Sequence, residues 1–334
     1  MNPPKTWMNP QEHMSAVLSS DWYKSVGTIQ DQIITSTTEF YKLKGYKFIM
    51  LPITTGTISS PMGLGSDSLP VKIQLEGVET YLADSMQFLL EFALRIHENG
   101  VYYIAPSFRG EKADARHLCQ FYHSEAEIVG DLDDVISFSE EYVMYLAEDI
   151  KTHHSALIER IAGTTDHIDQ MLSYSEKGFP RVTFEDGIMM LKGDAEAIKE
   201  IDGYQIINSY GEKKLMEKFG GFLWLTHFNH MTVPFYQAYG THGAAKCGDL
   251  LFGVGETLGA GERHYSGEQV VEALQQHQVP IEEYEWYIDL KNKVQIQTSG
   301  FGLGIERFMA WLFRHEDIRD MQMLPRFNGE KIYF

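Results

Sequence analysis

The sequence predicts an α+β fold. Segments whose apolar residues recur with helical spacing lie between short β-type runs, but they do not alternate regularly as in a parallel α/β sheet. Hydrophobic residues make up 43% and aromatic residues 13% of the 334 residues, so the chain can bury a sizeable core. Because no change of composition marks a linker, we expect a single domain of catalytic size.

The expected helices are the segments where apolar residues return every three or four positions. They cover residues 11–46, 83–98, 132–173 and 305–313. The expected strands are short apolar runs with β-branched or aromatic residues, and Pro52 ends the first of them. They cover residues 46–51, 101–108, 120–129, 222–228, 248–255 and 294–302. Residues 284–291 fit either state, and we expect loops at 54–69 and 109–117 because these segments are polar.

The charge balance limits the partners that the chain can bind. Its 28 Lys and Arg residues stand against 47 Asp and Glu residues, which gives a net charge of −19. Proteins that grip nucleic acid usually carry a basic face, and no stretch here gathers five or six basic residues. The composition therefore disfavours nucleic acids and membrane surfaces as main partners. The sequence has only two cysteines, and it shows no apolar leader and no apolar run long enough to span a membrane. These features indicate a cytoplasmic protein.

The first group of residues suited to chemistry lies on a strand–loop–strand unit. It comprises Arg109, Glu111, Arg116, His117 and Phe121. Two arginines and a histidine would suit a polyphosphate, and a carboxylate can accept a hydrogen bond from an amino group such as that of adenine. An aromatic ring can stack on a base. An exposed charged hairpin is the alternative, and residue types alone favour it.

Further candidates lie in the C-terminal half. Asp249 and Glu256 could together hold Mg²⁺ with substrate phosphates, although acidic residues at such a spacing are usually solvated. Arg263 follows a glycine-rich stretch and could pair with a carboxylate. The segment 300–307 leads from a strand directly into a helix, whose N-terminus favours anions. A glycine-rich packing turn is the alternative for this last segment.

Other chemistries find little support in the sequence. His227, His230 and His242 are close together, but no carboxylate pattern completes a metal site. Neither cysteine lies in a nucleophile motif, and no Gly-x-Ser-x-Gly elbow occurs. The glycine-rich segments lack the spacing of a P-loop or of a dinucleotide-binding loop.

Taken in order, these groups resemble the catalytic core of the class II aminoacyl-tRNA synthetases, and most closely the asparaginyl branch of the aspartyl/asparaginyl group. Residues 108–121 resemble motif 2, and residues 299–307 resemble motif 3 nearly letter for letter. Residues 253–263 resemble the metal- and side-chain-binding segment, and Pro52 fits the proline of motif 1. The resemblance implies the class II fold, an antiparallel sheet flanked by helices, and a homodimer formed through motif 1.

The resemblance also implies a role for each candidate residue. Arg109 and Arg307 would be catalytic and would stabilise charge on the α-phosphate. ATP would be bound by Glu111, Arg116, His117, Phe121 and Arg307. The amino acid would be bound by Ser85, Gln87, Glu125 and Arg263. Asp249 and Glu256 would hold Mg²⁺ while a carboxylate attacks ATP in line, giving an acyl-adenylate and pyrophosphate.

Departures from the family decide the predicted function. The family places an anticodon-binding domain before the core, whereas here we expect only an N-terminal extension, 1–24, before a catalytic domain, 25–334. Met62 stands where the family has an acid that holds the α-amino group, and Leu90 stands where aspartyl enzymes have a lysine. His264 stands where the family has a glutamate. These changes indicate an altered amino-acid pocket.

Core-only relatives of the family include ammonia-dependent asparagine synthetases. We therefore expect ATP-dependent adenylation of the aspartate side chain, followed by attack of ammonia, to give asparagine, AMP and pyrophosphate. On this hypothesis tRNA is not a partner. Two alternatives stay open: transfer of the adenylate to another amine or carrier in a biosynthetic pathway, and a paralogue that binds amino acid or ATP without turnover.

Overall fold

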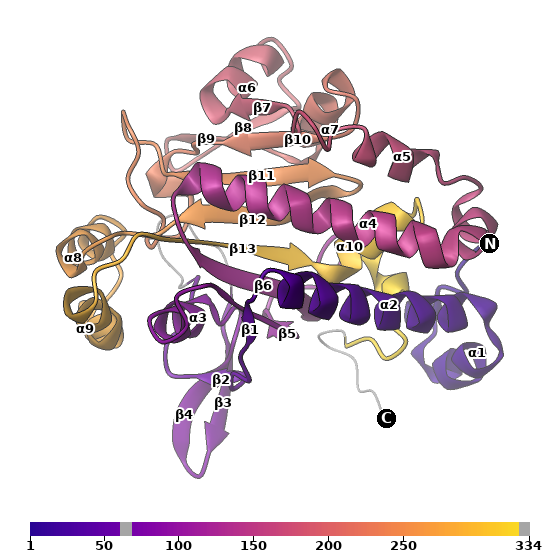
Figure 1. Cartoon of the computed structure of the whole chain (residues 1–334), viewed down its shortest axis with the longest axis horizontal. Helices are drawn as coiled ribbons and strands as arrows, with labels where there is room; N and C mark the ends of the chain where they lie inside the picture. The colour runs from indigo at the N-terminus through magenta and orange to yellow at the C-terminus, as the bar shows by residue number, and fades with distance from the viewer. Residues whose placement is uncertain (61–68, 327–334) are drawn as a thin grey trace.

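The computed structural model describes residues 1–60 and 69–326, so Met62 lies outside the described residues. Within these ranges eight strands form the main sheet (Figure 1). From one edge to the other they are β1 (Lys47–Phe48), β5 (Val101–Phe108), β6 (Gln120–Val129), β13 (Thr298–Gly304), β12 (Gly255–Glu262), β11 (Cys247–Phe252), β10 (Leu223–Thr226) and β7 (Arg181–Thr183). The central pairs are antiparallel and the two edge pairs are parallel. The predicted α+β class with an antiparallel sheet is confirmed.

The strands at the centre of the sheet agree best with the sequence. Strands β5 and β6 have the predicted bounds. Strand β1 is shorter than predicted because only Lys47 and Phe48 pair with β5. The segment 248–255, predicted as one strand, contains the turn between β11 and β12, at which Gly253 has a φ of +63°. Glycine adopts this left-handed conformation at little cost, so the chain can reverse there.

Long helices cover one face of the sheet (Figure 1). They are α2 (Asp21–Leu43) and α4 (Leu132–Ala162), with α10 (Ile305–Leu312) beside them. Tyr102 packs in the core beneath these helices, whereas Val101 and Tyr103 pack in a separate cluster with α3 (Gln87–Leu94). Because successive side chains of a strand point to opposite faces, α3 covers the other face of the sheet.

The helix ends follow from local capping. Residues 11–46, predicted as one helix, form α1 (His13–Ser19) and α2, because Ser20 is extended and its hydroxyl accepts the backbone N–H of Trp22. This is a typical N-cap. Residues 132–173 form α4 and α5 (Asp166–Leu172), separated at Gly163, whose φ of +82° ends the first helix.

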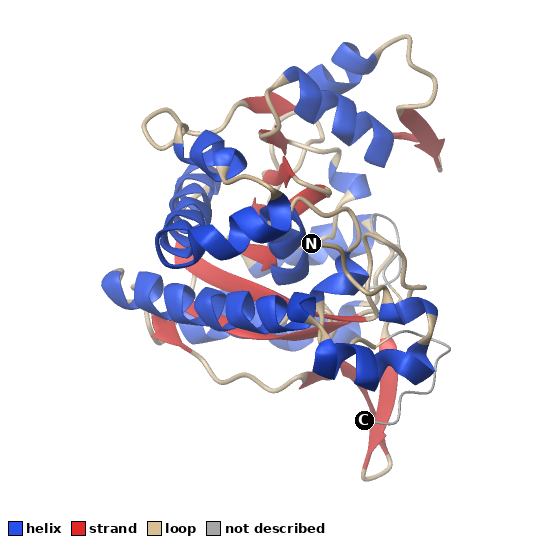
Figure 2. Cartoon of the chain, turned by 90° about the vertical axis from the view of Figure 1, so that its right-hand side faces the viewer, coloured by secondary structure: helices blue, strands red, loops and turns tan. Residues whose placement is uncertain are grey.

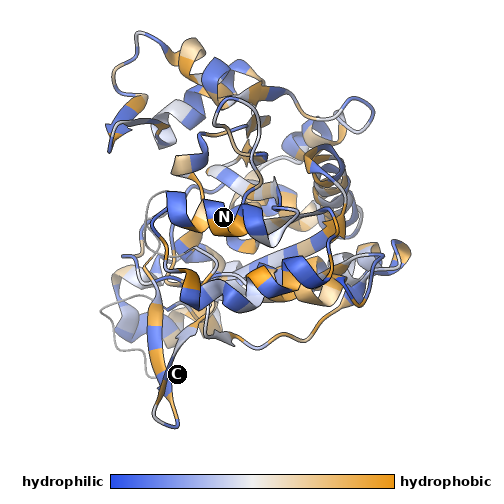
Figure 3. Cartoon of the chain, turned by 90° about the vertical axis from the view of Figure 1, so that its left-hand side faces the viewer, coloured by the Kyte–Doolittle hydropathy of each residue, from blue (hydrophilic) through white to orange (hydrophobic). Residues whose placement is uncertain are grey.

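Smaller units project from the sheet at opposite ends of the molecule (Figures 1 and 2). At one end, β3 (Val71–Leu75) and β4 (Val78–Leu82) form a hairpin that pairs with β2 (Thr54–Thr55), and its apolar and polar residues alternate along the strands (Figure 3). At the other end lie α6 (Phe184–Leu191), β8 (Ile198–Ile201), β9 (Tyr204–Ile207) and α7 (Ser209–Lys218). None of these elements was predicted, since each is short and depends on packing against its neighbours.

A helical pair flanks the sheet beside α3. It consists of α8 (Gly267–Gln276) and α9 (Glu285–Lys293), so the ambiguous segment 284–291 is mainly helical. The first residues of the chain pack on its last described turn: the Trp7 indole donates to Asp320, and the Arg319 guanidinium lies 3.5 Å from the Trp7 ring centroid. Among the described helices, none has the length and apolar character needed to cross a bilayer.

Candidate active site

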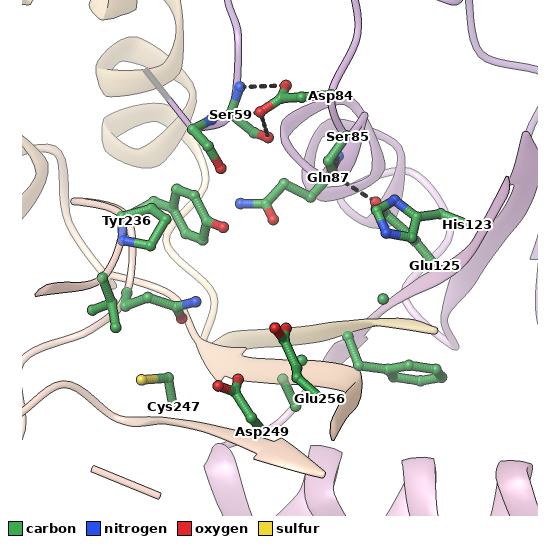
Figure 4. Close-up of a pocket in the computed structure, with 18 of the residues that line it drawn as sticks. Ser59, Asp84, Ser85, Gln87, His123, Glu125, Tyr236, Cys247, Asp249 and Glu256 are labelled. Carbon is green, nitrogen blue, oxygen red and sulfur yellow. Dashed lines mark hydrogen bonds and ion pairs between the residues drawn. The ribbon is translucent and has the colours of Figure 1, made fainter. Parts of the chain in front are cut away.

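Every residue predicted for the site lines one of two adjoining cavities. The larger, of about 490 Å³, is lined by the predicted ATP ligands Glu111, Arg116, His117, Phe121 and Arg307. The smaller, of about 270 Å³, is lined by the predicted amino-acid ligands Ser85, Gln87, Glu125 and Arg263, and by Asp249 (Figure 4). Arg109, His123, Glu256 and Gly302 line both. We call the larger the nucleotide cavity and the smaller the amino-acid cavity.

Pairing of β5 with β6 places Arg109 at the boundary between the cavities. Phe108 pairs with Gln120, and the backbone N–H of Arg109 donates to Cys119 O at 3.0 Å, which continues the ladder beyond the strand. The Arg109 guanidinium carbon lies 5.7 Å from the centroid of the Phe121 ring. Its Nε is buried and has no hydrogen-bond partner among the described residues. An anion at this position would satisfy that donor.

Strand β13 leads directly into α10, and this junction places Arg307 in the lining of the nucleotide cavity. Its Nη2 donates to the Arg116 carbonyl at 3.2 Å and its Nη1 to the Glu256 carbonyl. Burial lowers the pKa of the Arg307 guanidinium; Glu256 opposes this shift, and the nearby Arg116 and Arg109 add to it. The arginines are therefore held close enough to repel one another, and a polyphosphate would relieve that repulsion.

The acidic pair lies on neighbouring strands, β11 and β12, and both carboxylates point into the amino-acid cavity (Figure 4). A Cβ built on Gly259 would lie 3.2 Å from Glu256 Oε1 and 3.6 Å from Asp249 Oδ1. Desolvation and the neighbouring Glu256 raise the pKa of Asp249 well above its ordinary value, with Glu212 adding to the shift. A cation between the two carboxylates would offset this repulsion, so the pair fits Mg²⁺.

The described residues contain no cluster of three or more His, Cys, Asp or Glu side chains arranged to hold a metal ion. An ion held by Asp249 and Glu256 would therefore need oxygen ligands from elsewhere. Magnesium commonly keeps water and takes phosphate oxygens as ligands. The donor set thus suits an ion that arrives with a nucleotide.

Glu212 of α7, which the sequence did not suggest as a site residue, contacts Arg116 beside the nucleotide cavity. Its Oε2 accepts a hydrogen bond from Arg116 Nη2 at 2.8 Å. Burial raises the pKa of Glu212, although Arg116 opposes that shift. The pair lies over Gly255, where a Cβ would be 2.3 Å from the Arg116 guanidinium. A residue with any side chain at 255 would displace the ion pair.

Hydrogen bonds fix Asp84 and Glu125, two carboxylates near the N-terminus of α3. Asp84 accepts from the Ser59 N–H, the Ser59 hydroxyl and the Ser60 N–H at 2.8–3.0 Å. Glu125 accepts from Ser85 Oγ at 2.6 Å and contacts His123 Nδ1 at 2.9 Å. Burial acts to raise the pKa of Glu125, but the bonds from His123 and Ser85 hold it below its ordinary value. Glu125 is thus a carboxylate facing the cavity.

Arg263 is held by partners within the protein. Its Nε and Nη2 donate to Glu127 Oε1 at 3.1 and 2.6 Å, and Nη1 donates to Gln237 Oε1 at 3.3 Å. Its guanidinium also lies 5.3 Å from the Tyr236 ring centroid. Burial raises the pKa of Glu127 to about 7 against the effect of Arg263. The cation at the end of the amino-acid cavity is therefore already neutralised.

A second buried ion pair supports this arrangement. Lys291 of α9 contacts Glu91 of α3, and both are fully buried. The Tyr287 hydroxyl donates to Glu91 at 2.7 Å. Burial acts to raise the pKa of Glu91, but Lys291 and Arg263 lower it below its ordinary value. The ion pairs Lys291–Glu91 and Arg263–Glu127 thus connect α9 with α3 and the end of β12 with β6 behind the cavity.

Comparison with known proteins decides the family. The sequence profile described as tRNA synthetases class II (D, K and N) matches residues 11–328. The chain belongs to this family. It is 28% identical over 328 residues to the asparagine–tRNA ligase of Koribacter versatilis, covering 92% of this chain and 70% of the relative. The resemblance to the class II synthetases, and the prediction of an ATP-dependent ligase at the level of the family, are confirmed.

Solved structures confirm the class II fold. The asparaginyl-tRNA synthetase of Pyrococcus horikoshii complexed with asparaginyl-adenylate superposes with a TM-score of 0.86 at 23% identity, covering 96% of this chain and 72% of that one. The asparaginyl-tRNA synthetase of Entamoeba histolytica in complex with asparaginyl-adenylate gives 0.82 at 21% identity, covering 98% and 72%. At these identities the likeness concerns the fold.

Two predictions are overturned by these findings. Ammonia-dependent asparagine synthesis from aspartate is contradicted, because the relatives are asparagine–tRNA ligases, and the two alternative functions find no support either. The prediction that tRNA is not a partner conflicts with the same relatives and is wrong. That prediction rested on the short segment expected before the catalytic core and on the net charge of −19, but a charge summed over the chain does not report on a local surface. Arg109, Lys112, Arg116 and Arg307 gather at one cavity despite it.

Proposed function

We propose that this protein is an ATP-dependent aminoacyl-tRNA ligase that activates asparagine as its adenylate and transfers it to tRNA. One observation carries the proposal: Arg109 and Glu256 lie where a nucleotide-sized cavity meets a smaller cavity built for an amino acid. An α-phosphate and an amino-acid carboxylate bound in the two cavities would meet at that boundary. The named relatives support tRNA as the acceptor.

Arg109 and Arg307 are the proposed catalytic residues. In the adenylation step the α-phosphate gains charge as the carboxylate attacks, and pyrophosphate leaves. The buried guanidinium of Arg307 would stabilise that charge. Arg109 Nε, which has no hydrogen-bond partner among the described residues, would do the same. Positioning and electrostatics suffice for such a reaction, so no covalent nucleophile is required.

The remaining ligands divide between the two substrates. Glu111, Arg116, His117 and Phe121 would bind ATP in the nucleotide cavity. Asp249 and Glu256 would hold Mg²⁺, which supplies positive charge to the phosphates. Ser85, Gln87 and Glu125 would bind the amino acid, with Gln87 pointing into the cavity opposite Tyr236 (Figure 4).

The charge of the amino-acid cavity favours a neutral side chain over aspartate. Asp84, Glu125, Asp249 and Glu256 line it, whereas Arg263 is already paired with Glu127. Leu90, at the position of the lysine in aspartyl enzymes, is fully buried among apolar residues and offers no cation. A second carboxylate entering this cavity would meet an excess of negative charge without an unpaired cation at the side-chain end.

Amino-acid-dependent exchange of pyrophosphate into ATP tests the activation step. We expect asparagine to support exchange at least tenfold better than aspartate, since a tenfold preference needs only about 1.4 kcal/mol. Charging of tRNA with labelled asparagine then tests the transfer step. Exchange with aspartate alone, or exchange without any charging of tRNA, would count against the proposal.

We also propose that the protein acts as a homodimer formed through α2 and β1. Ile34, Leu43 and Phe48 are exposed on these elements, and Met50, which follows β1, is 91% exposed. Apolar side chains gathered on adjacent elements are typical of an interface. Light scattering should give twice the mass of the 38.2 kDa chain, and Met50→Glu should lower it. The low cysteine content favours the cytoplasm as the compartment.

A further inference from the structure

A group of buried histidines lies behind the amino-acid cavity. His230 is in η3 (His230–Thr232), His264 follows β12, and His277 ends α8. Each is at most 3% exposed. None of the three lines the cavities just described, yet His230 binds the carbonyl of the cavity residue Gln237 and His264 follows the cavity residue Arg263. Histidines are seldom buried in such proximity without partners that fix them.

Two of these rings bind the backbone on either side of Tyr236. His264 Nε2 donates to the Phe235 carbonyl at 3.0 Å, and His230 Nε2 donates to the Gln237 carbonyl at 2.8 Å. His277 Nε2 lies 3.0 Å from His230 Nδ1 and braces that ring. The carbonyls flanking one cavity residue are thus held from two different elements.

The carbonyls also fix the protonation of the rings. A carbonyl only accepts, so His230 and His264 must carry their protons on Nε2. Burial lowers the pKa of His230 to about 4 and that of His264 to about 3, so both rings are neutral. In a neutral His230 ring Nδ1 is an acceptor, and His277 donates to it from Nε2.

The segment that these histidines hold has little regular structure of its own. Between β10 and β11, residues 227–246 contain η3 and isolated bridges, and among the described bridges the one between Gln237 and Arg263 joins the segment to residues outside it. The same segment supplies Tyr236, which faces Arg263, and Gln237, whose amide accepts from Arg263 Nη1. Backbone bonds hold the segment after Gln237, where the Ala238 N–H donates to Glu262 O at 2.7 Å, while the bonds from His264 and His230 hold the carbonyls of Phe235 and Gln237.

We propose that His230, His264 and His277 are positioning residues for amino-acid binding. By holding the carbonyls of Phe235 and Gln237, they set Tyr236 and Gln237 against Arg263 and so fix the end of the amino-acid cavity. They line neither cavity, and the segment 227–246 contributes no residue to the lining of the nucleotide cavity. The proposal rests on the proposed function only in taking an amino acid as the occupant of the smaller cavity.

The test compares His264→Leu, which removes the donor, with His264→Gln, which keeps an N–H donor near the position of Nε2. The matched control is His153→Leu on the exposed face of α4. In pyrophosphate exchange we expect His264→Leu to raise KM for the amino acid about tenfold, as one lost hydrogen bond would, and to change KM for ATP less than about twofold. His264→Gln should restore most of the amino-acid affinity, and the control should match the wild type.

Hydrogen–deuterium exchange gives a second readout that needs no activity. The amides of residues 235–238 should exchange faster in His264→Leu than in His264→Gln or the wild type. If His264→Leu does not fold, His277→Leu serves in its place, since both carbonyl bonds then keep their donors while the bond between His277 and His230 is lost.

The outcomes separate this proposal from the proposed function. Absence of exchange with any amino acid in the wild type would overturn the function, and the deuterium experiment would still test the positioning. Equal rises in both KM values, an unchanged KM for the amino acid in a folded His264→Leu, or a His264→Gln as impaired as His264→Leu would overturn the positioning role.

Discussion

The nucleotide cavity and the amino-acid cavity are built in different ways. The first takes its cations from paired strands and a helix start: Arg109 extends β5, and Arg307 lies in the first turn of α10. The second takes part of its wall from the irregular segment 227–246, and Arg263, the cation at its end, is bound within the protein by Glu127. In the nucleotide cavity, Arg109 next to a regular strand keeps a donor available for a ligand. In the amino-acid cavity, Arg263 is already paired with Glu127.

Removal of Arg307 is the strongest test of this contrast. We expect Arg307→Ala to lower kcat/KM in pyrophosphate exchange by about 10³-fold, because a buried guanidinium aimed at a developing charge is lost. Calorimetry should show asparagine binding unchanged, since Arg307 does not line the amino-acid cavity. Arg307→Lys should be partly active. An Arg307→Ala protein that turns over normally would remove the catalytic assignment.

Arg263 should matter more for stability than for the chemical step. Arg263→Leu leaves Glu127 and Glu91 buried beside each other without the cation between them, which should cost about 3 kcal/mol of unfolding free energy. Glu127→Gln should cost less, because the pKa of Glu127 is already raised to about 7 and its neutral form is accessible. Urea denaturation measures both variants. If Glu127→Gln lowered the free energy of unfolding more than Arg263→Leu, the cation would not be the more important partner of the Arg263–Glu127 ion pair.

The same contrast explains what the sequence could predict. Arg109 and Phe121 were found because the first directly follows β5 and the second lies on β6, two strands whose bounds follow from composition. Arg307 was found because strand and helix adjoin. Glu127 could have been found, since it lies two residues after Glu125 on β6 and so faces the same side. Glu212 and Gln237 could not, because they come from segments whose positions depend on tertiary packing. The acceptor was mispredicted from the short segment expected before the catalytic core, with the whole-chain charge as added support.

The histidines behind the amino-acid cavity should make the free energy of unfolding decrease as the pH falls. Because burial lowers the folded pKa of His264 to about 3, its ring stays neutral in the folded protein while the unfolded chain takes up a proton below about 6.5. Its contribution is fully present above pH 6.5 and is lost as the pH falls. His230, with a pKa of about 4, acts in the same direction. Glu127 acts in the opposite direction between pH 7 and 4.5, because its folded form takes up a proton first.

A variant comparison isolates one histidine from these opposing groups. Between pH 6.5 and 4.5, the free energy of unfolding should fall by about 2 kcal/mol less in His264→Gln than in the wild type. Denaturation of both proteins at each pH measures this difference. Parallel pH profiles for the two proteins would show that His264 is not held neutral in the folded state.

Glu212 offers the smallest effect and the most direct test of how the nucleotide cavity is supported. Two consequences of Glu212→Gln oppose each other: Arg116 loses its charged partner at 2.8 Å, and a negative charge leaves the neighbourhood of the phosphates. We expect the first to dominate, because the contact is direct and partly buried, and KM for ATP should rise about fivefold at nearly constant kcat. Glu217→Gln removes an exposed charge from the same helix and is the matched control. A fall in KM for ATP would mean that Glu212 acts through its charge alone and that Arg116 is oriented by other contacts.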